Sequence, residues 1–448
     1  MRRWAEATIV LALAAMAGCR TQEIRYGPVP IHNPPRPAPA PEPPPVPAPR
    51  DEPAPPPASR APALKVGLIV DTPAGTVTSP SGMTVETEGG GNIDELAAGQ
   101  GLAFSADADG GIAMTVLGAN GDPAGRTRHG LESPVVVRAA DGGVVEVRGA
   151  PYRGAILVQN SGRRGLTFVN RLDIESYLLG VVPKELGDVG EGVFEAIKAQ
   201  AVAARTYAVK NMGRRTSLGF DVYPGTQDQV YGGVNAEREL VSRAVRETAG
   251  EVLTYGGEPI NAYYHSTCAG RTAAIDEVWN VSPVPYLVSV VDVDPRTGEA
   301  WDRASGKFQW TERWSGTQLV SILNRTLADS LRGRRIRDVY DMDVLSRTQS
   351  GRVRAMRIDT DAGSFIVGRD RVRWILAPAR GGILNSAKFD VRVERSGGQV
   401  VSAVAEGGGW GHGIGMCQFG AMGRARAGQD YRTILDAYYP GARLSRMY

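Results

Sequence analysis

Three short stretches of the sequence carry residue types that can do chemistry. "VVPKELG" (181–187) contains one carboxylic acid, Glu185, among largely apolar residues. "YYHSTCAG" (263–270) and "GWGHGIGMCQFG" (409–420) each combine a histidine with a cysteine. A carboxylic acid can transfer protons to and from a substrate, and histidine with cysteine can bind a metal. The sequence therefore indicates an acid–base site, and a metal site has to be weighed beside it.

Two interpretations of Glu185 follow from its neighbours. Val181, Val182 and Leu186 can surround the carboxyl group with apolar atoms, which raises the pKa of a carboxylic acid and suits it to general acid catalysis. Pro183 restrains the backbone just before it. In the other interpretation Glu185 lies in the first turn of the following helix, where a negative charge complements the helix N-terminus.

Polar residues further along the chain are candidates for substrate binding, each with a structural alternative. Arg205 can bind a carbonyl or a carboxylate of a substrate, or it can bond buried backbone carbonyls. Gln229 and Tyr231 in "DQVYGG" can face a bound substrate, or they can belong to a turn and the core.

His265, Ser266 and His412 are expected to line the same site. Six glycines between residues 407 and 415 allow backbone conformations closed to other residues and let a ligand approach closely. The loop is not a phosphate-binding loop of the Walker type, because Gly-Lys-Ser/Thr is absent. The alternative is that both histidines are ordinary core residues.

Cys268 and Cys417 allow two arrangements. His265 with Cys268 and His412 with Cys417 make a four-ligand set of the zinc type. In an exported protein two core cysteines also invite a disulfide, because the compartment is oxidising. We favour the Cys268–Cys417 disulfide and expect no cofactor, with zinc as the alternative.

The first 19 residues read as a targeting segment. Two arginines precede the apolar run "ATIVLALAAMAG", which is too short to span a bilayer. The run ends at "AMAGC", which resembles a bacterial lipoprotein cleavage site and predicts lipidation of Cys19; an ordinary secretory signal is the alternative. We therefore expect an exported, lipid-anchored protein, periplasmic or at the cell surface. Arg20 weakly favours the outer membrane in a cell with two membranes.

A proline-rich segment follows the targeting segment. Of the 35 residues from 28 to 62, 17 are proline, and such a segment cannot bury a core. It predicts a disordered, stiff tether between the anchor and the folded part. The formal net charge of +3 gives no argument for a nucleic-acid partner.

The elements that must position these side chains predict an α+β fold. Residues 64–70 and 154–170 read as a buried strand and a hairpin, and the chain up to residue 160 is β-rich. Helical periodicity predicts helices near 192–212, 235–248 and 310–330, and a last helix in 431–444 that stops at Pro440–Gly441. We divide the chain into a mixed α/β catalytic domain with a β-rich insertion, preceded by the signal peptide and the tether. The expected segments are 1–19 (signal peptide with lipobox), 20–63 (tether), 64–160 (β-rich part), 161–300 (catalytic core), 301–400 (α/β insertion) and 401–448 (glycine-rich and helical end of the core).

Six blocks of the sequence together resemble one known family. They are, in order, "NRLDIESYLLGVVPKELG", "EAIKAQAVAARTYAV", "DQVYGG", "AYYHSTCAGRT", "PYLVSVVD" and "GWGHGIGMCQFGAMGRARAG". This pattern is similar to the SpoIID/LytB family, which is named for the stage II sporulation protein D and an amidase enhancer. The resemblance runs from about residue 65 to the C-terminus.

The resemblance implies a protein that acts on peptidoglycan. In the best-understood members this is a lytic transglycosylase, and the position of their catalytic acid corresponds to Glu185. One carboxyl group suffices for that reaction, because the 6-hydroxyl of muramic acid replaces water as the nucleophile and leaves a 1,6-anhydromuramic end. The same group acts as acid and then as base. With peptidoglycan as the substrate, Arg205, Gln229 and Tyr231 would contact its sugars, Arg205 at an N-acetyl carbonyl or a lactyl carboxylate.

One departure from the family pattern and one alternative function go with this resemblance. Some members bind zinc through histidines and cysteines just before the motif matched by "QVY", whereas the corresponding stretch here, "GFDVYPGTQDQVYGG", contains neither residue type. The amidase enhancer in the family name implies a second hypothesis, in which the protein binds peptidoglycan without chemistry and stimulates a cell-wall amidase.

Overall fold

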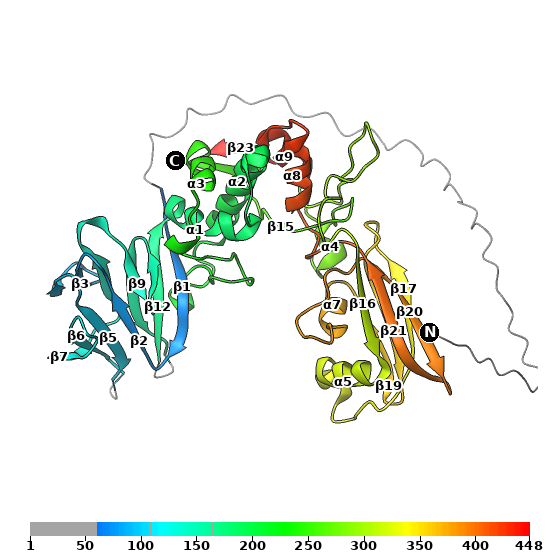
Figure 1. Cartoon of the computed structure of the whole chain (residues 1–448), viewed down its shortest axis with the longest axis horizontal. Helices are drawn as coiled ribbons and strands as arrows, with labels where there is room; N and C mark the ends of the chain where they lie inside the picture. The colour runs from blue at the N-terminus through cyan, green and yellow to red at the C-terminus, as the bar shows by residue number, and fades with distance from the viewer. Residues whose placement is uncertain (1–60, 108–109, 163–164) are drawn as a thin grey trace, which may run out of the picture. The chain divides into compact units, whose positions relative to one another are not determined.

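A computed structural model describes residues 61–107, 110–162 and 165–448 (Figure 1). The expected signal peptide, Cys19 and nearly all of the tether lie outside the described residues. The structure is a mixture of helix and strand, as the sequence predicts. None of the described helices combines the length and the apolar character that crossing a membrane requires.

The N-terminal strands form two six-stranded sheets that share one core. Valine and other apolar side chains fill this core, and rings such as those of Phe104 and Phe168, 6.3 Å apart, meet between the sheets. The predicted strand at 64–70 and the predicted hairpin at 154–170 are confirmed. One sheet has the order β1 (Ala63–Thr72), β12 (Leu166–Asp173), β11 (Ala155–Asn160), β8 (Val135–Ala139), β3 (Met83–Thr87) and β4 (Asn92–Leu96). The other has the order β10 (Ala150–Tyr152), β9 (Val145–Val147), β2 (Ala74–Thr78), β5 (Gly101–Ala106), β6 (Ile112–Leu117) and β7 (Pro123–Leu131).

A group of helices surrounds α2 (Phe194–Asn211). The alanine-rich sequence of α2 favours a helix, and its small side chains let neighbouring helices approach on several faces. Asp173, at the end of β12, caps the following helix by accepting a hydrogen bond from the Ser176 amide at 3.0 Å. The helices that pack on α2 are α1 (Ile174–Leu186), α3 (Glu239–Glu247), α8 (Gln418–Arg426) and α9 (Tyr431–Tyr438). A small sheet beside them has the order β14 (Glu258–Pro259), β13 (Glu251–Tyr255) and β23 (Arg443–Arg446).

The insertion has its own hydrophobic core, which includes Trp314, Leu323 and Met356. One sheet has the order β16 (Trp310–Ser315), β21 (Gln399–Gly407) and β20 (Phe389–Ser396), and a second has the order β17 (Val339–Arg347), β18 (Val353–Thr360) and β19 (Gly363–Val367). The helices of the insertion are α5 (Gly316–Thr326), α6 (Ala328–Leu331) and α7 (Arg371–Ile375).

Two of the predicted helices have different bounds in the structure. The helix expected at 235–248 is α3, which begins only at Glu239 after a 3-10 turn (Val234–Ala236). The segment expected to be helical from residue 310 starts as strand β16, and the capping box of Ser315 and Gln318 begins α5. The predicted stop of the last helix is confirmed, because α9 ends at Tyr438, just before Pro440–Gly441, and the chain then pairs as β23 with β13.

Two short strands bring distant parts of the chain together. β15 (Tyr264–His265) pairs in parallel with β22 (Met416–Cys417), and Thr267 forms an isolated antiparallel bridge with Trp410. The remaining short elements are α4 (Ile275–Val278) and the 3-10 turns Ala140–Gly142, Glu191–Val193 and Thr216–Leu218. The second and third chemistry-bearing stretches of the sequence therefore lie side by side.

Candidate active site

Glu185 lies in the last turn of α1, which continues through Pro183 and ends at Leu186. The interpretation of Glu185 as a first-turn acid of the following helix is wrong, because α2 begins only at Phe194. At a helix C-terminus the backbone dipole disfavours a negative charge. The position of this carboxyl group therefore does not serve the stability of the helix.

The carboxyl group of Glu185 is partly buried and held by its neighbours. The backbone amide of Val230 donates a hydrogen bond to its Oε1 at 2.8 Å. Burial raises the pKa of Glu185, while hydrogen bonds from Val230, Tyr264 and Gln418 oppose that rise without cancelling it. A carboxylic acid with a raised pKa holds its proton to higher pH, as a general acid must.

Glu185 opens into a pocket of about 510 Å³. Residues from the end of α1, the loop before Val230, β15 and its continuation, the glycine-rich loop and α8 line it. Trp410 is the most exposed aromatic side chain among them, at 48%. The lining includes Lys184, Glu185, Thr226, Asp228, Val230, Tyr264, His265, Ser266, Trp410, His412, Gln418, Phe419 and Met422.

Asp228 is the second carboxylate among the lining residues, and its oxygens are engaged. The side chain is fully buried and pairs with Arg215 at 2.9 Å. It also accepts hydrogen bonds from the Tyr207 hydroxyl at 3.0 Å and the Tyr223 amide at 2.8 Å. Glu185 is thus the carboxyl group of this pocket that remains available for proton transfer.

Gln229 lies behind the pocket rather than in it. Its side-chain amide donates hydrogen bonds to the Tyr264 hydroxyl at 3.0 Å and to the Ala204 carbonyl at 3.3 Å, and its oxygen accepts one from Tyr177. Only 1% of the residue is exposed. Gln229 can therefore orient Tyr264, but it is placed too deep to contact a sugar directly.

Tyr231 belongs to the core. Its ring packs against Tyr177, with centroids 5.0 Å apart, and its hydroxyl donates to the Asn170 side chain at 2.8 Å. The sugar-facing role expected for Tyr231 does not fit this placement. The placement fits the alternative interpretation, in which Tyr231 belongs to the core.

Arg205 is also remote from the pocket and fully buried. Its guanidinium forms two 2.8 Å hydrogen bonds with the Glu175 carboxylate and donates to the carbonyls of Val245 and Glu251 at 3.2 Å. A substrate has no access to these donors. The expected sugar-binding role of Arg205 is therefore replaced by a structural one.

His265, Ser266 and His412 do come together at the pocket. The rings of the two histidines lie 5.6 Å apart, and the His412 Nδ1 accepts a hydrogen bond from the Ile414 amide at 3.0 Å. Burial lowers the pKa of His412 to about 4, so its ring is neutral at pH 7, with Nε2 protonated. A Cβ at Gly411 would lie 2.8 Å from that of His265, which explains why the loop needs glycine there.

Cys268 and Cys417 are brought together, but as free thiols rather than as the predicted disulfide. Their sulfur atoms and the nearest His265 nitrogen lie within 4.8 Å of one another. His412, the fourth member of the zinc-type set considered from the sequence, is not part of this group. Its ring lines the pocket instead.

Several pocket residues escaped the sequence analysis, among them Tyr264, Trp410 and Gln418. Tyr264 and Gln418 contact Glu185 from β15 and the start of α8, and Trp410 projects from the glycine-rich loop. A tryptophan between glycines was a usable signal, because an exposed aromatic ring on a flexible loop is typical of ligand stacking. Tyr264 and Gln418 gave no such signal, since their approach to Glu185 depends on long-range pairing.

A larger hollow of about 920 Å³ lies against the insertion. Its acidic residues, Asp390 and Glu406, form ion pairs with Arg347 and Arg392. Both acids are thus engaged by arginines at the protein surface. We therefore centre the candidate active site on Glu185.

The fold and the site together define a protein whose pocket has one carboxylic acid, Glu185, available for proton transfer. Residues 162–255 match the model of the stage II sporulation protein (SpoIID) family. Residues 297–415 match a domain of unknown function, DUF8618, which covers the insertion.

Curated relatives cover most of the folded part. An uncharacterised protein of Brachyspira hyodysenteriae is 34% identical over 61% of this chain and 67% of its own length. The stage II sporulation protein D of Bacillus subtilis is 30% identical over 62% of this chain and 76% of its own length. The amidase enhancer of Bacillus subtilis is 32% identical over 60% of this chain, but only 40% of that longer protein is matched. The chain belongs to the SpoIID/LytB family.

Proposed function

We propose that the protein cleaves peptidoglycan glycan strands by non-hydrolytic lytic transglycosylation. The observation that carries this proposal is the single available acid of the pocket. Hydrolysis by most glycosidases requires two working carboxylates, one on each side of the scissile bond. Here Glu185 is available, while Asp228 is fully buried and bound to Arg215.

One carboxyl group completes the proposed reaction. Protonated Glu185 gives its proton to the glycosidic oxygen, and the bond from that oxygen to the muramic C1 breaks. The 6-hydroxyl of the same muramic residue then bonds to C1 and loses its proton to the Glu185 carboxylate. The products are a 1,6-anhydromuramic end and a free 4-hydroxyl group, and Glu185 is again protonated.

The surrounding residues have positioning roles in this proposal. The Val230 amide fixes one carboxyl oxygen of Glu185, and Tyr264, itself held by Gln229, approaches it through its hydroxyl. Trp410 offers a half-exposed ring for stacking on a sugar. Ser266 and neutral His412 supply hydrogen-bonding groups at the pocket wall.

The experiment is a digestion of stem-free glycan strands in water enriched in ¹⁸O, followed by mass spectrometry. Lytic transglycosylation produces 1,6-anhydromuramic ends without ¹⁸O, whereas hydrolysis produces reducing ends that carry it. Anhydro ends must disappear with Glu185→Gln. Formation of labelled reducing ends in excess of an enzyme-free control, or anhydro ends at the wild-type rate in the variant, contradicts the proposal.

A second candidate function is stimulation of a cell-wall amidase without chemistry, which the similarity to an amidase enhancer favours. In that case the pocket binds glycan strands, and adding the protein accelerates a purified amidase. Equal acceleration by wild type and Glu185→Gln, with no anhydro product from either, would support this candidate. For both functions we propose an exported, lipid-anchored location facing the cell wall.

A further inference from the structure

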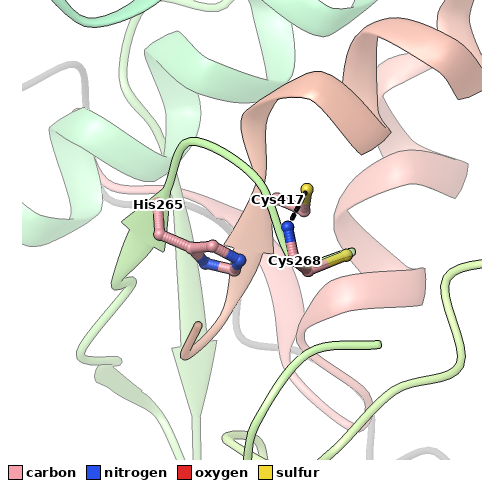
Figure 2. A group of neighbouring side chains, drawn as sticks. All are labelled: His265, Cys268 and Cys417. Carbon is pink, nitrogen blue, oxygen red and sulfur yellow. Dashed lines mark hydrogen bonds between the residues drawn. The ribbon is translucent and has the colours of Figure 1, made fainter. Parts of the chain in front are cut away.

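A second cluster of reactive side chains lies behind the pocket. His265 on β15, Cys268 just after it and Cys417 on β22 place a nitrogen and two sulfur atoms within 4.8 Å of one another (Figure 2). All three side chains are buried, and Cys268 and Cys417 are completely so. The parallel pairing of β15 with β22 assembles the cluster from segments about 150 residues apart.

The histidine of this cluster presents an unpaired nitrogen. His265 Nδ1 lies 3.2 Å from the Ile414 carbonyl oxygen, which can only accept, so Nδ1 carries the proton. Nε2 is then a lone-pair acceptor, and among the described residues it has no hydrogen-bond partner although the residue is only 4% exposed. A buried acceptor without a partner costs about 1–3 kcal/mol. A histidine bound to a metal typically has this arrangement, with its other N–H on a backbone carbonyl.

The Cys417 sulfur atom accepts hydrogen bonds from its surroundings, whereas the Cys268 thiol donates to the Asp292 carboxylate at 3.4 Å. Two backbone amides, those of Cys268 and Gly420, donate to the Cys417 Sγ at 3.3 and 3.4 Å. Figure 2 shows the first of these hydrogen bonds. The carboxylate of Asp302, held by the Cys268 amide at 2.8 Å, lies 3.7 Å from the Cys417 Sγ.

We propose that His265, Cys268 and Cys417 bind a divalent cation of the zinc class, with Asp302 at the fourth position. Two thiolates and an imidazole prefer Zn²⁺ over Mg²⁺ or Ca²⁺, which prefer oxygen ligands. Binding releases the two thiol protons to solvent. A disulfide between the cysteines would instead leave the buried His265 Nε2 unpaired among the described residues.

The site would also stabilise the wall of the pocket. Each paired strand carries one ligand next to a residue that contacts Glu185: Tyr264 precedes His265, and Gln418 follows Cys417. A metal across the two strands therefore fixes Tyr264 and Gln418 relative to each other. This effect on Glu185 depends on the proposed function, whereas metal binding itself does not.

The test is metal uptake by the full-length, detergent-solubilised chain after reduction and chelation. We expect one Zn²⁺ or Co²⁺ per chain, with the thiolate-to-cobalt charge-transfer band in the near ultraviolet. Cys268→Ser, Cys417→Ser and His265→Gln should each lower the affinity at least tenfold. His129→Gln is the matched control, because the His129 side chain is 69% exposed and its contact is with Asp107, so this variant should bind as wild type does.

Thiol alkylation, read peptide by peptide, tests the same site without any substitution. Bound Zn²⁺ should slow the alkylation of Cys268 and Cys417 in the wild-type protein. The proposal is overturned if the reduced protein takes up no metal, if the three variants bind as tightly as wild type, or if metal leaves both alkylation rates unchanged. Isolation of a disulfide-bonded form that takes up no metal after reduction would also overturn it. Each of these results leaves the lytic activity to be decided separately.

Discussion

Replacing Glu185 by Gln should separate catalysis from stability. The amide side chain has nearly the same shape, and its oxygen can still accept the Val230 hydrogen bond that the carboxylate accepts at 2.8 Å. The variant cannot donate a proton to a leaving oxygen. General acid–base catalysis contributes about 10²–10⁴-fold, so we expect a rate loss of that size, or about 3–5 kcal/mol on the barrier.

Glu185→Gln should lower the rate of catalysis, but it should not lower the stability of the fold. Burial raises the pKa of Glu185 above its ordinary value of 4.5, so the folded chain binds this proton more tightly than the unfolded chain does. The wild-type protein therefore loses stability as pH rises from the unfolded pKa through the raised folded pKa, and the loss persists above it. Gln has no such titration, so the variant should be as stable as wild type in acid and at least as stable at neutral pH.

Two measurements check this pair of effects. Release of anhydromuramic ends gives the rate, and thermal unfolding on both sides of the pH window gives the stability. Glu191→Gln is the control, since the Glu191 side chain is 68% exposed and lies outside the pocket, and it should alter neither measurement appreciably. A Glu185→Gln protein that unfolds at lower temperature in step with its lost activity would refute the reasoning, because the residue would then be structural.

Three further substitutions test other parts of the site and the core. Tyr264→Phe removes a hydrogen bond that lowers the pKa of Glu185, so the high-pH limb of the cleavage profile should move to higher pH, as pH–rate measurements would show. Trp410→Ala should weaken glycan binding by about 1–2 kcal/mol, or ~5–30-fold in KM, with a smaller change in kcat. Arg205→Met should lower the free energy of unfolding in urea by about 3 kcal/mol or more, because the Glu175 carboxylate loses its buried partner.

Each of the three predicted effects has an outcome that would contradict it. An unchanged pH profile for Tyr264→Phe would mean that its hydroxyl does not reach Glu185 in solution. A loss confined to kcat in Trp410→Ala would remove the stacking role. Arg243→Met is the control for Arg205→Met, because the Arg243–Glu191 pair is exposed and should contribute less than about 1 kcal/mol; equal losses in the two variants would argue against a buried ion pair.

Short-range sequence patterns predicted those helices and strands that are determined by neighbouring residues. The hairpin at 154–170 and the alanine-rich helix α2 follow directly from alternation and from 3.6-residue periodicity. The end of α1 did not follow, because Pro183 indicates a helix boundary, whereas the helix loses one hydrogen bond there and continues to Leu186. The start of α5 was placed too early because Trp310–Ser315 contains residues that suit either a helix or a strand.

The candidate site was predictable only where one residue carried the signal. Glu185 stood out as a lone acid among apolar neighbours. Arg205 and Tyr231 were polar residues in well-marked motifs, and nothing local distinguishes a buried ion pair or a core hydroxyl from a sugar contact. The approach of Tyr264 and Gln418 depends on the pairing of β15 with β22, which no short-range pattern encodes.

The bridge between Thr267 and Trp410 has a consequence for how the chain folds. It closes a loop of about 140 residues, and closing a disordered loop of that length costs about 4 kcal/mol of chain entropy. The insertion inside this loop has a hydrophobic core of its own. If it folds first, it holds the two ends near each other and removes most of that entropic cost before β15 and β22 meet. The insertion would then act as an internal folding template for the pocket, independently of any contact that it makes with substrate.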